Sequence, residues 1–420
     1  MKVLLVGSGG REHALAWKLG TAVDVQLHAA PGNPGIAELG ECHPVRAEDG
    51  EALLGLARSL DVDLAVIGPE APLVAGVADE LRHAGVGVFG PGRAAARIEG
   101  SKTFAKDVMR AANVPFARAL PVACAPCVVK VDGLAAGKGV FVCRTAADVD
   151  AALGAAARYD GPLVIEELLE GEEVSLLALS DGRDVLALPP AQDFKRLGDG
   201  DTGPNTGGMG SYAPVDLLSP QQVEEILDRV HRPVVRELAR RGTPFVGLLF
   251  AGLILTEEGL RVLEFNCRFG DPETQSILPL LDGDLLSALA AAASGELAGV
   301  ELAGTAGAAV TVVLAAGGYP ARGDTGTAIR GVVDAEAVGA LVFHAGTALR
   351  ANSLVTSGGR ILGVTAVGET VDEARRHAYE GAALISFEGM QLRRDIAAAA
   401  AASGRSARRE PPDAGATLAP

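Results

Sequence analysis

The sequence predicts an α/β protein that begins with a doubly wound parallel sheet and ends in a small β-rich domain. Three observations support this prediction. Strand-like and helical patterns alternate over the first 100 residues, a glycine-rich segment with two lysines lies near residue 130, and short strands dominate from about residue 296. With 420 residues, of which 48% are hydrophobic and 21% charged, the chain has ample material for two to four globular domains.

Residues 1–100 are predicted to form a series of βαβ units. We expect strands at Val3–Val6, Val25–Ala29, Leu64–Ile67 and Val86–Phe89, and helices at Glu12–Leu19, Glu51–Ser59 and Ala75–His83. Sheets of this kind bind ligands at the carboxyl ends of their strands. The loops expected at that edge are 7–12, 31–33 and 68–72.

The loop after the first strand matches a dinucleotide-binding turn only in part. Glu12 stands where the third glycine belongs, and no acidic residue closes the second strand. Gly9 and Gly10 nevertheless allow backbone N–H groups to face an anion at a helix N-terminus, and Arg11 adds positive charge. We therefore expect a small phosphate ester, rather than NAD, at Gly9–Glu12.

A new section begins near residue 100. Ser101 is a plausible N-cap for a helix from Lys102 to about Ala112. Two strands then flank the sequence DGLAAGKG at 132–139, a loop whose N–H groups and lysines can surround a triphosphate. It is not a Walker A loop, because its glycine spacing is one residue short and it lacks the Ser or Thr. The residues expected at the phosphates are Lys130, Gly137, Lys138 and Gly139.

An acidic turn follows this hairpin. The backbone of Glu166–Leu168, which includes Glu167, could contact an adenine edge, and Glu173 could accept ribose hydroxyls. The alternative for the remaining acids is that they are solvated turn charges.

The stretch Val262–Phe269 is predicted to be a strand that ends at a Gly-Asp-Pro turn. Side chains alternate along a strand, so Glu264, Asn266 and Arg268 would share one face. Two hard oxygen ligands and a guanidinium suit a Mg²⁺–phosphate site. A half-buried strand with a solvated outer face explains the same pattern, and at this point both interpretations stay open.

Composition excludes several classes of protein. The net charge of −16 argues against a nucleic-acid-binding protein, and no apolar run approaches the length of a membrane span. Glycines soon interrupt the apolar start, so we interpret Met1–Val6 as the first buried strand of a cytoplasmic protein. Five cysteines do not form a disulfide framework, and we favour unrelated thiols over a redox pair for Cys124 and Cys127.

Five long motifs occur in an order that resembles the ATP-grasp superfamily and, within it, the phosphoribosylamine–glycine ligase family. They are GGREHA at 9–14, GPEAPL at 68–73, DGLAAGKGV at 132–140, DTGPNTGGMG at 201–210 and RFGDPETQ at 268–275. The resemblance covers about residues 1–395.

The resemblance implies that ATP, glycine and 5-phosphoribosylamine give glycinamide ribonucleotide, ADP and phosphate through glycyl phosphate. Mg²⁺, with Mn²⁺ as an alternative, would be held by Glu264 and Asn266. The catalytic residues expected are Lys138, Arg268 and Asp271. The ATP-binding residues are Lys102, Lys130, Gly137, Lys138, Gly139, Glu166, Glu167, Leu168 and Glu173. The substrate-binding residues are Gly9, Gly10, Arg11, Glu12, Glu70, Asp193, Asn205, Asp271 and Glu273. For Asp271, helix N-capping is the competing interpretation.

The resemblance also suggests how the chain is divided into domains. At three places, however, this sequence differs from the pattern of the family. We expect an α/β substrate domain at 1–100, ATP-grasp lobes at 101–295 with a lid at 116–188, a β-rich domain at 296–396 and a disordered tail at 397–420. The segment 116–127 is shorter than usual, Phe194 replaces the usual His, and Phe245–Leu255 lacks the second acid of many ATP-grasp enzymes. We expect a monomer.

Three alternatives remain. The first is an ATP-grasp carboxylate–amine ligase with a different acid or amine. The second is a dinucleotide-dependent oxidoreductase, and the third is a non-catalytic nucleotide-binding module. The departures of the first loop argue against the oxidoreductase, and the Lys130, Lys138, Glu264, Asn266 and Arg268 set argues against the module.

Overall fold

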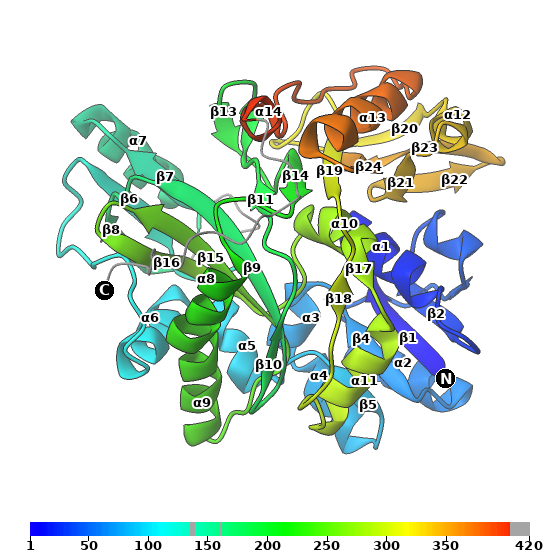
Figure 1. Cartoon of the computed structure of the whole chain (residues 1–420), viewed down its shortest axis with the longest axis horizontal. Coiled ribbons are helices and arrows are strands. Elements are labelled where there is room, and N and C mark those ends of the chain that lie inside the picture. The colour runs from blue at the N-terminus through cyan, green and yellow to red at the C-terminus, as the bar shows by residue number, and fades with distance from the viewer. Residues whose placement is uncertain (135–138, 160, 404–420) are drawn as a thin grey trace.

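A computed structural model describes residues 1–134, 139–159 and 161–403. Its ribbon shows an N-terminal α/β domain, a central region with a projecting lid, and a C-terminal domain of antiparallel strands (Figure 1). The predicted α/β class and the N-terminal parallel sheet are confirmed.

The N-terminal sheet is parallel, with strand order β3-β2-β1-β4-β5. Its strands are β1 Lys2–Gly7, β2 Gln26–Pro31, β3 Glu41–Cys42, β4 Leu64–Ile67 and β5 Gly87–Phe89. The helices are α1 Gly10–Leu19, η1 Ile36–Glu38, α2 Gly50–Leu60, α3 Glu70–Ala75, α4 Val77–His83 and α5 Arg93–Gly100. One prediction was wrong in detail, because the expected helix Ala75–His83 is divided by Gly76, whose φ of 95° ends α3 and starts α4.

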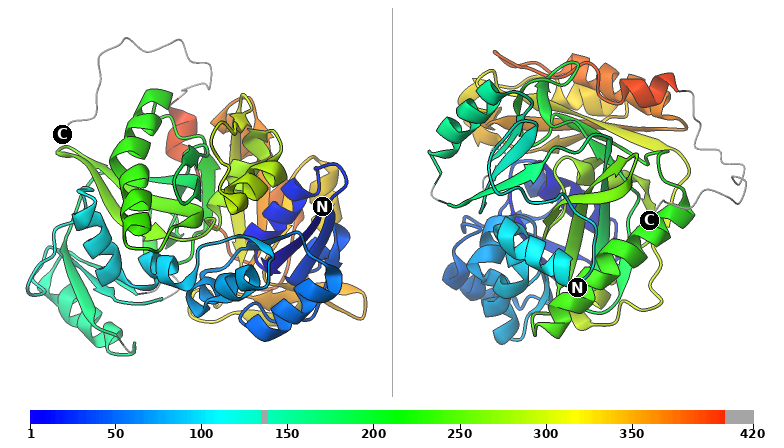
Figure 2. Two further views of the ribbon diagram at one scale, coloured as in Figure 1. Left: turned by 90° about the horizontal axis from the view of Figure 1, so that it is seen from below. Right: turned by 90° about the vertical axis from the view of Figure 1, so that its left-hand side faces the viewer.

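The lid is a small antiparallel sheet of order β7-β6-β8 covered by one helix. It follows α6 Lys102–Ala111, whose predicted cap is confirmed because Ser101 accepts a hydrogen bond from the Phe104 amide. Its elements are β6 Cys127–Val131, β7 Val140–Cys143, α7 Ala146–Ala156 and β8 Leu163–Glu167. Figure 2 shows that these strands project from one end of the molecule.

The central sheet is antiparallel, with order β10-β9-β15-β16. Its strands are β9 Glu172–Asp181, β10 Val185–Ala187, β15 Val246–Thr256 and β16 Gly259–Asn266, and α8 Pro220–Ile226, the π-helix η2 Leu227–His231 and α9 Arg232–Arg240 precede β15. Because β9 and β10 pair within this sheet, they are not part of the lid sheet, although we had included them in the expected lid at 116–188.

The C-terminal sheet includes strands from the central region, with order β11-β14-β19-β24-β21. The contributing strands are β11 Gln192–Asp193, β14 Gly210–Ala213, β19 Ala308–Ala315, β21 Leu341–His344 and β24 Arg360–Gly368. A second sheet contains β20 Asp324–Ala328, β22 Thr347–Arg350 and β23 Ser353–Gly358, and the helices are α12 Val332–Ala337 and α13 Val371–Leu384. The connecting elements are β12 Arg196–Gly198, β13 Thr202–Asn205, α10 Glu273–Ile277, η3 Leu278–Leu280, β17 Leu281–Asp282, α11 Leu285–Ser294 and β18 Ala303–Gly304.

The end of the chain differs from the expectation. The segment 397–420 was predicted to be disordered, but its first residues form α14 Ala398–Ala402, which packs against α13. The reason is burial of apolar surface, because partly buried Ala400 and Ala401 contact the main hydrophobic core. Among the described residues, no helix is long and apolar enough to cross a membrane.

Candidate active site

Strand β16 carries the two predicted metal ligands. Its antiparallel pairing with β15 sets Glu264 opposite Gly252 and Asn266 opposite Phe250. Residues two apart on a strand share a face, so the carboxylate and the amide oxygen point to the same side. This donor set fits a hard divalent cation. Because Gly252 has no side chain to offer, the position opposite Glu264 supplies no second carboxylate.

Buried lysines lie beside this strand. Lys130 Nζ is 2.8 Å from Glu166 Oε2 and donates to the carbonyl oxygen of Leu263 at 3.0 Å. Lys106 Nζ is 2.8 Å from the other oxygen, Glu166 Oε1. Because Leu263 immediately precedes Glu264, the ammonium group of Lys130 lies next to the strand that carries the predicted metal ligands.

Lys102 joins this group from the start of α6. Its Nζ donates to the carbonyl oxygen of Gly133 at 3.1 Å. Burial lowers the pKa of Lys102, and the neighbouring carboxylate of Glu264 partly offsets this effect. Positive charge therefore gathers where β16, α6 and the glycine-rich hairpin meet, which is a suitable environment for phosphate groups.

The other predicted ATP-binding residues are only partly brought together. Glu167 points to the surface, where its carboxylate accepts a hydrogen bond from the Arg118 amide at 2.8 Å. Leu168 directly follows β8, and the carbonyl oxygen of Gly139 accepts a hydrogen bond from the Val131 amide. Gly137 and Lys138 lie outside the described residues. Their predicted roles, like that of Leu168, stay predictions.

Glu173, Asp193 and Lys195 form a connected polar group. Lys195 Nζ lies 2.7 Å from Glu173 Oε2 and 2.9 Å from Asp193 Oδ1. The ammonium of Lys195 holds the pKa of Glu173 below its usual value. A ribose contact by Glu173 would therefore be made by an ionised, well-oriented carboxylate.

The prediction that Arg268 lies on the strand was wrong. Strand β16 ends at Asn266, and the amide of Cys267 donates to Glu99 Oε2 at 2.8 Å instead of continuing a sheet. Arg268 Nε then lies 3.3 Å from Glu70 Oε2, and Nη2 lies 3.2 Å from Glu99 Oε1. The guanidinium is thus aimed at the N-terminal domain by two carboxylates.

These two carboxylates differ in their electrostatics. Burial raises the pKa of Glu99, although Arg268 opposes the effect. For Glu70, burial acts in the same direction, but Arg268 and Arg11 outweigh it and the pKa falls below its usual value. Glu70 is therefore ionised at neutral pH and stands at the start of α3, where it can meet a substrate cation.

The predicted anion loop is closed by its own acid. The Gly9 amide donates to Glu12 Oε2 at 2.6 Å, so that amide is not free for a ligand as we had expected. Arg11 Nε donates to Glu12 Oε1 at 2.6 Å, and Arg11 Nη1 donates to the carbonyl oxygen of Phe269 at 3.0 Å. Since a Cβ on Gly7 would lie only 2.6 Å from Glu12 Cγ, this packing requires glycine there. Glu12 positions the loop, and Arg11 ties it to the segment after β16.

Asp271 is held by one distant partner, Arg360, and one local partner, Gln275. Arg360 Nη2 lies 3.1 Å from Asp271 Oδ2, and Gln275 Nε2 donates to Asp271 Oδ1 at 2.8 Å. Burial would raise the pKa of Asp271, but Arg360 and Arg11 keep it below its usual value. Its side chain does not cap α10, whose N-cap is Pro272, so the capping interpretation is not supported. Gly10 approaches the same place, because a Cβ on it would lie 2.6 Å from Gln275 Nε2.

Glu273 is a buried acid that interacts electrostatically with both Asp193 and Arg268. It is 4% exposed, and its Oε1 lies 3.4 Å from the Ser175 hydroxyl. Burial and the nearby Asp193 raise the pKa of Glu273 to about 7. It can therefore exchange a proton near neutral pH, as a general acid or base must.

The loop that carries Asn205 contacts the lid. Asn205 Nδ2 donates to the carbonyl oxygen of Val140 on β7 at 3.2 Å. Phe194, in place of the usual His, packs near Tyr212, and the guanidinium of Arg393 lies 5.0 Å from its ring centre. This position therefore carries a packing contact rather than an imidazole.

Four charged residues of the site escaped the sequence analysis. Lys106, Glu99, Lys195 and Arg360 each pair with a predicted site residue. The sequence offers a signal for Lys195 only, because it lies in the polar segment that begins at Asp193. The others are ordinary helix or strand charges whose partners become neighbours only on folding.

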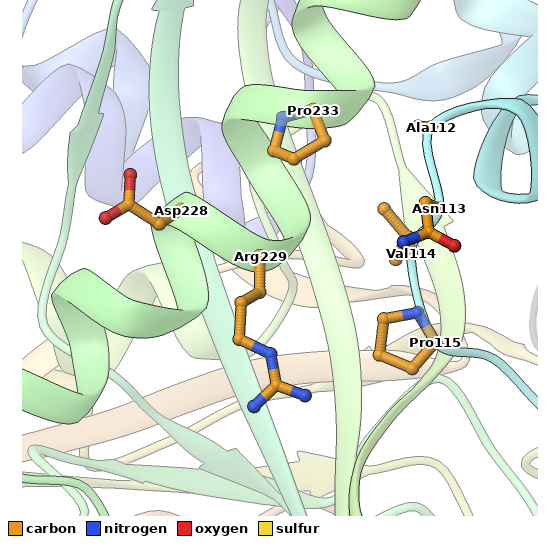
Figure 3. A pocket seen from close by; sticks show the side chains of 7 residues that line it. All are labelled: Ala112, Asn113, Val114, Pro115, Asp228, Arg229 and Pro233. Carbon is orange, nitrogen blue, oxygen red and sulfur yellow. The ribbon is translucent and has the colours of Figure 1, made fainter. Parts of the chain in front are cut away.

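A separate cavity of about 560 Å³ lies beside the loop that follows α6 (Figure 3). The loop of Asn113, Val114 and Pro115 forms one wall, and Arg229 and Pro233 come from the opposite helices. Its lining contains none of the predicted site residues.

Comparison with known proteins identifies the family. Residues 1–99 match the N domain of phosphoribosylglycinamide synthetase, 100–274 match its ATP-grasp (A) domain and 309–399 match its C domain. The chain belongs to the phosphoribosylglycinamide synthetase family. The match includes both the Gly9–Glu12 loop and the Glu264–Glu273 segment, so the two halves of the site occur together in one known family.

Curated relatives in this family are similar over nearly their whole length. A phosphoribosylamine–glycine ligase of Streptomyces coelicolor is 53% identical over 418 residues, which are 96% of this chain and 100% of that protein. One of Leifsonia xyli is 50% identical over 420 residues, covering 95% and 100%.

Solved structures agree with this assignment. The crystal structure of phosphoribosylamine–glycine ligase from Thermotoga maritima has a TM-score of 0.81 and 34% identity, covering 94% of this chain and 100% of that one. The biotin carboxylase domain of Hydrogenobacter thermophilus 2-oxoglutarate carboxylase, in complex with MgADP, has a TM-score of 0.69 and 17% identity over 93% of this chain and 91% of that one. The second likeness shows the shared fold alone.

Proposed function

We infer that this chain joins glycine to 5-phosphoribosylamine with ATP, giving glycinamide ribonucleotide, ADP and phosphate, as its family name implies. One observation carries the inference beyond the name. Arg11 of the anion loop donates to the residue next to Arg268, and Arg268 pairs with Glu70. The expected phosphoribosylamine loop and the end of the metal-binding strand therefore meet directly, as transfer between two substrates requires.

We propose that ATP lies between the lid and the central sheet. Its phosphates would contact Lys102 and Lys130, which stand beside β16. Glu264 and Asn266 would hold a divalent cation, Mg²⁺ or Mn²⁺, which neutralises phosphate charge when bound. The ammonium groups of buried Lys130 and half-buried Lys102 would neutralise the same phosphate charge from the protein side. Binding requires Lys130 to exchange at least one of its present partners, Glu166 or the Leu263 carbonyl, for a phosphate oxygen.

We propose that Arg268 stabilises the oxygen atoms of the transferring phosphoryl group. Glycine is a poor electrophile as a carboxylate, so phosphorylation by ATP must precede attack by the amine. The carboxylates of Glu70 and Glu99 fix the guanidinium in place, which means that no reorganisation is needed as charge develops.

The attack of the amine on the acyl phosphate would involve the two acids that follow Arg268 in sequence, Asp271 and Glu273. Asp271 is ionised and oriented by Arg360, which suits it to hold an ammonium group. Glu273, with its pKa near 7, suits removal of the proton that the attacking amine must lose. Lid closure would keep water from the acyl phosphate.

The test is ADP release from ATP while glycine and freshly prepared phosphoribosylamine are varied, with Mg²⁺ and Mn²⁺ compared. Turnover is expected only when both substrates are present. Turnover with another carboxylic acid in place of glycine would favour a different ATP-grasp ligase, and ADP release without either substrate would contradict the proposed reaction.

A further inference from the structure

A cluster of metal-ligating side chains lies on the N-terminal sheet, apart from the groups described above. It consists of His28 on β2, Glu41 on β3 and His43, which directly follows β3. His28 is paired in register with Glu41 in the parallel sheet, and His43 lies two residues further along. Because side chains two apart share a face, the three groups project to one side of the sheet edge.

The distances within the cluster suit a single small cation. His28 Nδ1 is 3.2 Å from His43 Nε2 and 3.5 Å from Glu41 Oε2, and the last two atoms are 4.0 Å apart. A triangle of these sides has a point about 2.1 Å from all three atoms, which is close to the usual length of a zinc–nitrogen or zinc–oxygen bond. That point lies in the plane of the three atoms, so a tetrahedral ion requires the Glu41 carboxylate to move roughly half an ångström toward His43, which the exposure of Glu41 allows.

The chemistry of the ligands selects the kind of ion. Two imidazoles and one carboxylate suit Zn²⁺, Co²⁺, Ni²⁺ or Cu²⁺, whereas Mg²⁺ prefers oxygen ligands throughout. The side chains of His28 and His43 are 13% and 15% exposed, and that of Glu41 is 67% exposed. The site is thus walled by the histidines and open on the carboxylate side, where water can complete a tetrahedron.

We propose that His28, Glu41 and His43 bind one transition-metal ion and that this ion fastens the edge of the N-terminal sheet. Strand β3 has two residues and is joined to β2 by two residue pairs. The loop between them carries Asn33, whose side-chain amide donates to the carbonyl oxygens of Ser8 and His344. A metal bridge from β2 to β3 would hold both ends of this loop, which joins the first and last domains.

A simple hydrogen bond between the two imidazoles is the competing explanation, and metal titration separates the two. Tag-free, full-length protein is stripped with chelator and titrated with Co²⁺ in excess Mg²⁺, which occupies the Glu264 site. We expect one equivalent of Co²⁺ with visible absorption typical of tetrahedral coordination, displaced by Zn²⁺. The same band is expected in Glu264→Ala, because that residue belongs to the other site. If the wild-type protein does not bind one equivalent of Co²⁺ tightly, the proposal is wrong.

Variants then assign the ligands. Glu41→Gln and His43→Asn should each weaken Co²⁺ binding by at least about tenfold. Glu41 is exposed, so its replacement does not threaten folding. His83→Asn is the matched control, because His83 is an exposed histidine whose Nδ1 lies near the carbonyl oxygen of Asp79 in α4. Zn²⁺ should raise the Tm of the wild type and of His83→Asn but not of Glu41→Gln. Equal Co²⁺ affinity in all variants would contradict the assignment.

Discussion

The buried group of Glu166, Lys106 and Lys130 yields the sharpest stability prediction. Glu166 is 3% exposed in its side chain, and each of its oxygens lies 2.8 Å from one lysine nitrogen. The change Glu166→Gln keeps the size of the side chain but removes the negative charge. Two ammonium groups, 9% and 7% exposed, would then remain in the interior without a counter-ion.

The expected cost follows from this geometry. Breaking a buried ion pair by removing one partner costs about 3–5 kcal/mol, because an uncompensated charge is left behind. The matched ATP-grasp segment spans residues 100–274. For a unit of that size, each kcal/mol shifts Tm by about 2–4 °C, so the variant should melt roughly 6–20 °C below the wild type. Differential scanning calorimetry of the full chain, without nucleotide, measures this shift.

The neighbouring residue supplies the control. Glu167 pairs with Arg118, which is 73% exposed, and exposed pairs of this kind contribute little. Glu167→Gln should therefore melt within about 4 °C of the wild type. If Glu166→Gln melts as close to the wild type as Glu167→Gln does, the buried charges are not a stabilising unit and the reasoning fails.

Three further predictions concern the site. Glu264→Ala should raise the Mg²⁺ concentration for half-maximal activity by about tenfold or more. Glu258→Ala, at an exposed position, should leave this concentration unchanged. If both variants show the same Mg²⁺ dependence as the wild type, Glu264 is not a ligand. Arg360→Met removes the main counter-ion of Asp271 and should raise its pKa, so the acid limb of the kcat/KM profile should move to higher pH; an unmoved limb would contradict this. Burial raises the pKa of Glu273 to about 7, so the protonated folded form contributes stability that is full below the unfolded value of 4.5 and is lost as pH rises through about 7. Glu273→Gln should therefore gain Tm relative to the wild type between pH 5 and pH 8, and a constant difference would refute the shift.

Local patterns predicted that the two candidate metal ligands share a face, but they did not predict the surroundings of these residues. Glu264 and Asn266 share a face because they are two residues apart on one strand, which is a purely local rule. The same rule failed at Arg268, because Glu99, 168 residues away in sequence, takes the Cys267 amide and ends the strand. Periodicity describes a strand while it lasts and cannot tell where a distant residue interrupts it.

Long-range charge pairs explain most of what the sequence could not supply. Arg360 contacts Asp271 from the C-terminal domain, 89 positions away, and nothing in its own neighbourhood distinguishes it from a surface arginine. Glu12 shows a second limit of sequence reasoning. Its place in a glycine-rich loop suggested a ligand contact, which stays a prediction, but gave no sign that its carboxylate also closes the loop itself.

The mixed origin of the C-terminal sheet limits how this chain could be divided. Strand β14 comes from the central region and β19 from the C-terminal domain, and the two are paired from Gly210–Val312 to Ala213–Ala309. A gene cut between β18 and β19 would give two polypeptides, each with an unpaired strand edge that promotes aggregation. Expressed together, the pieces would restore one continuous sheet and bring Arg360 back to Asp271. Activity would then return only through complementation, which makes this connection a natural place for a split reporter.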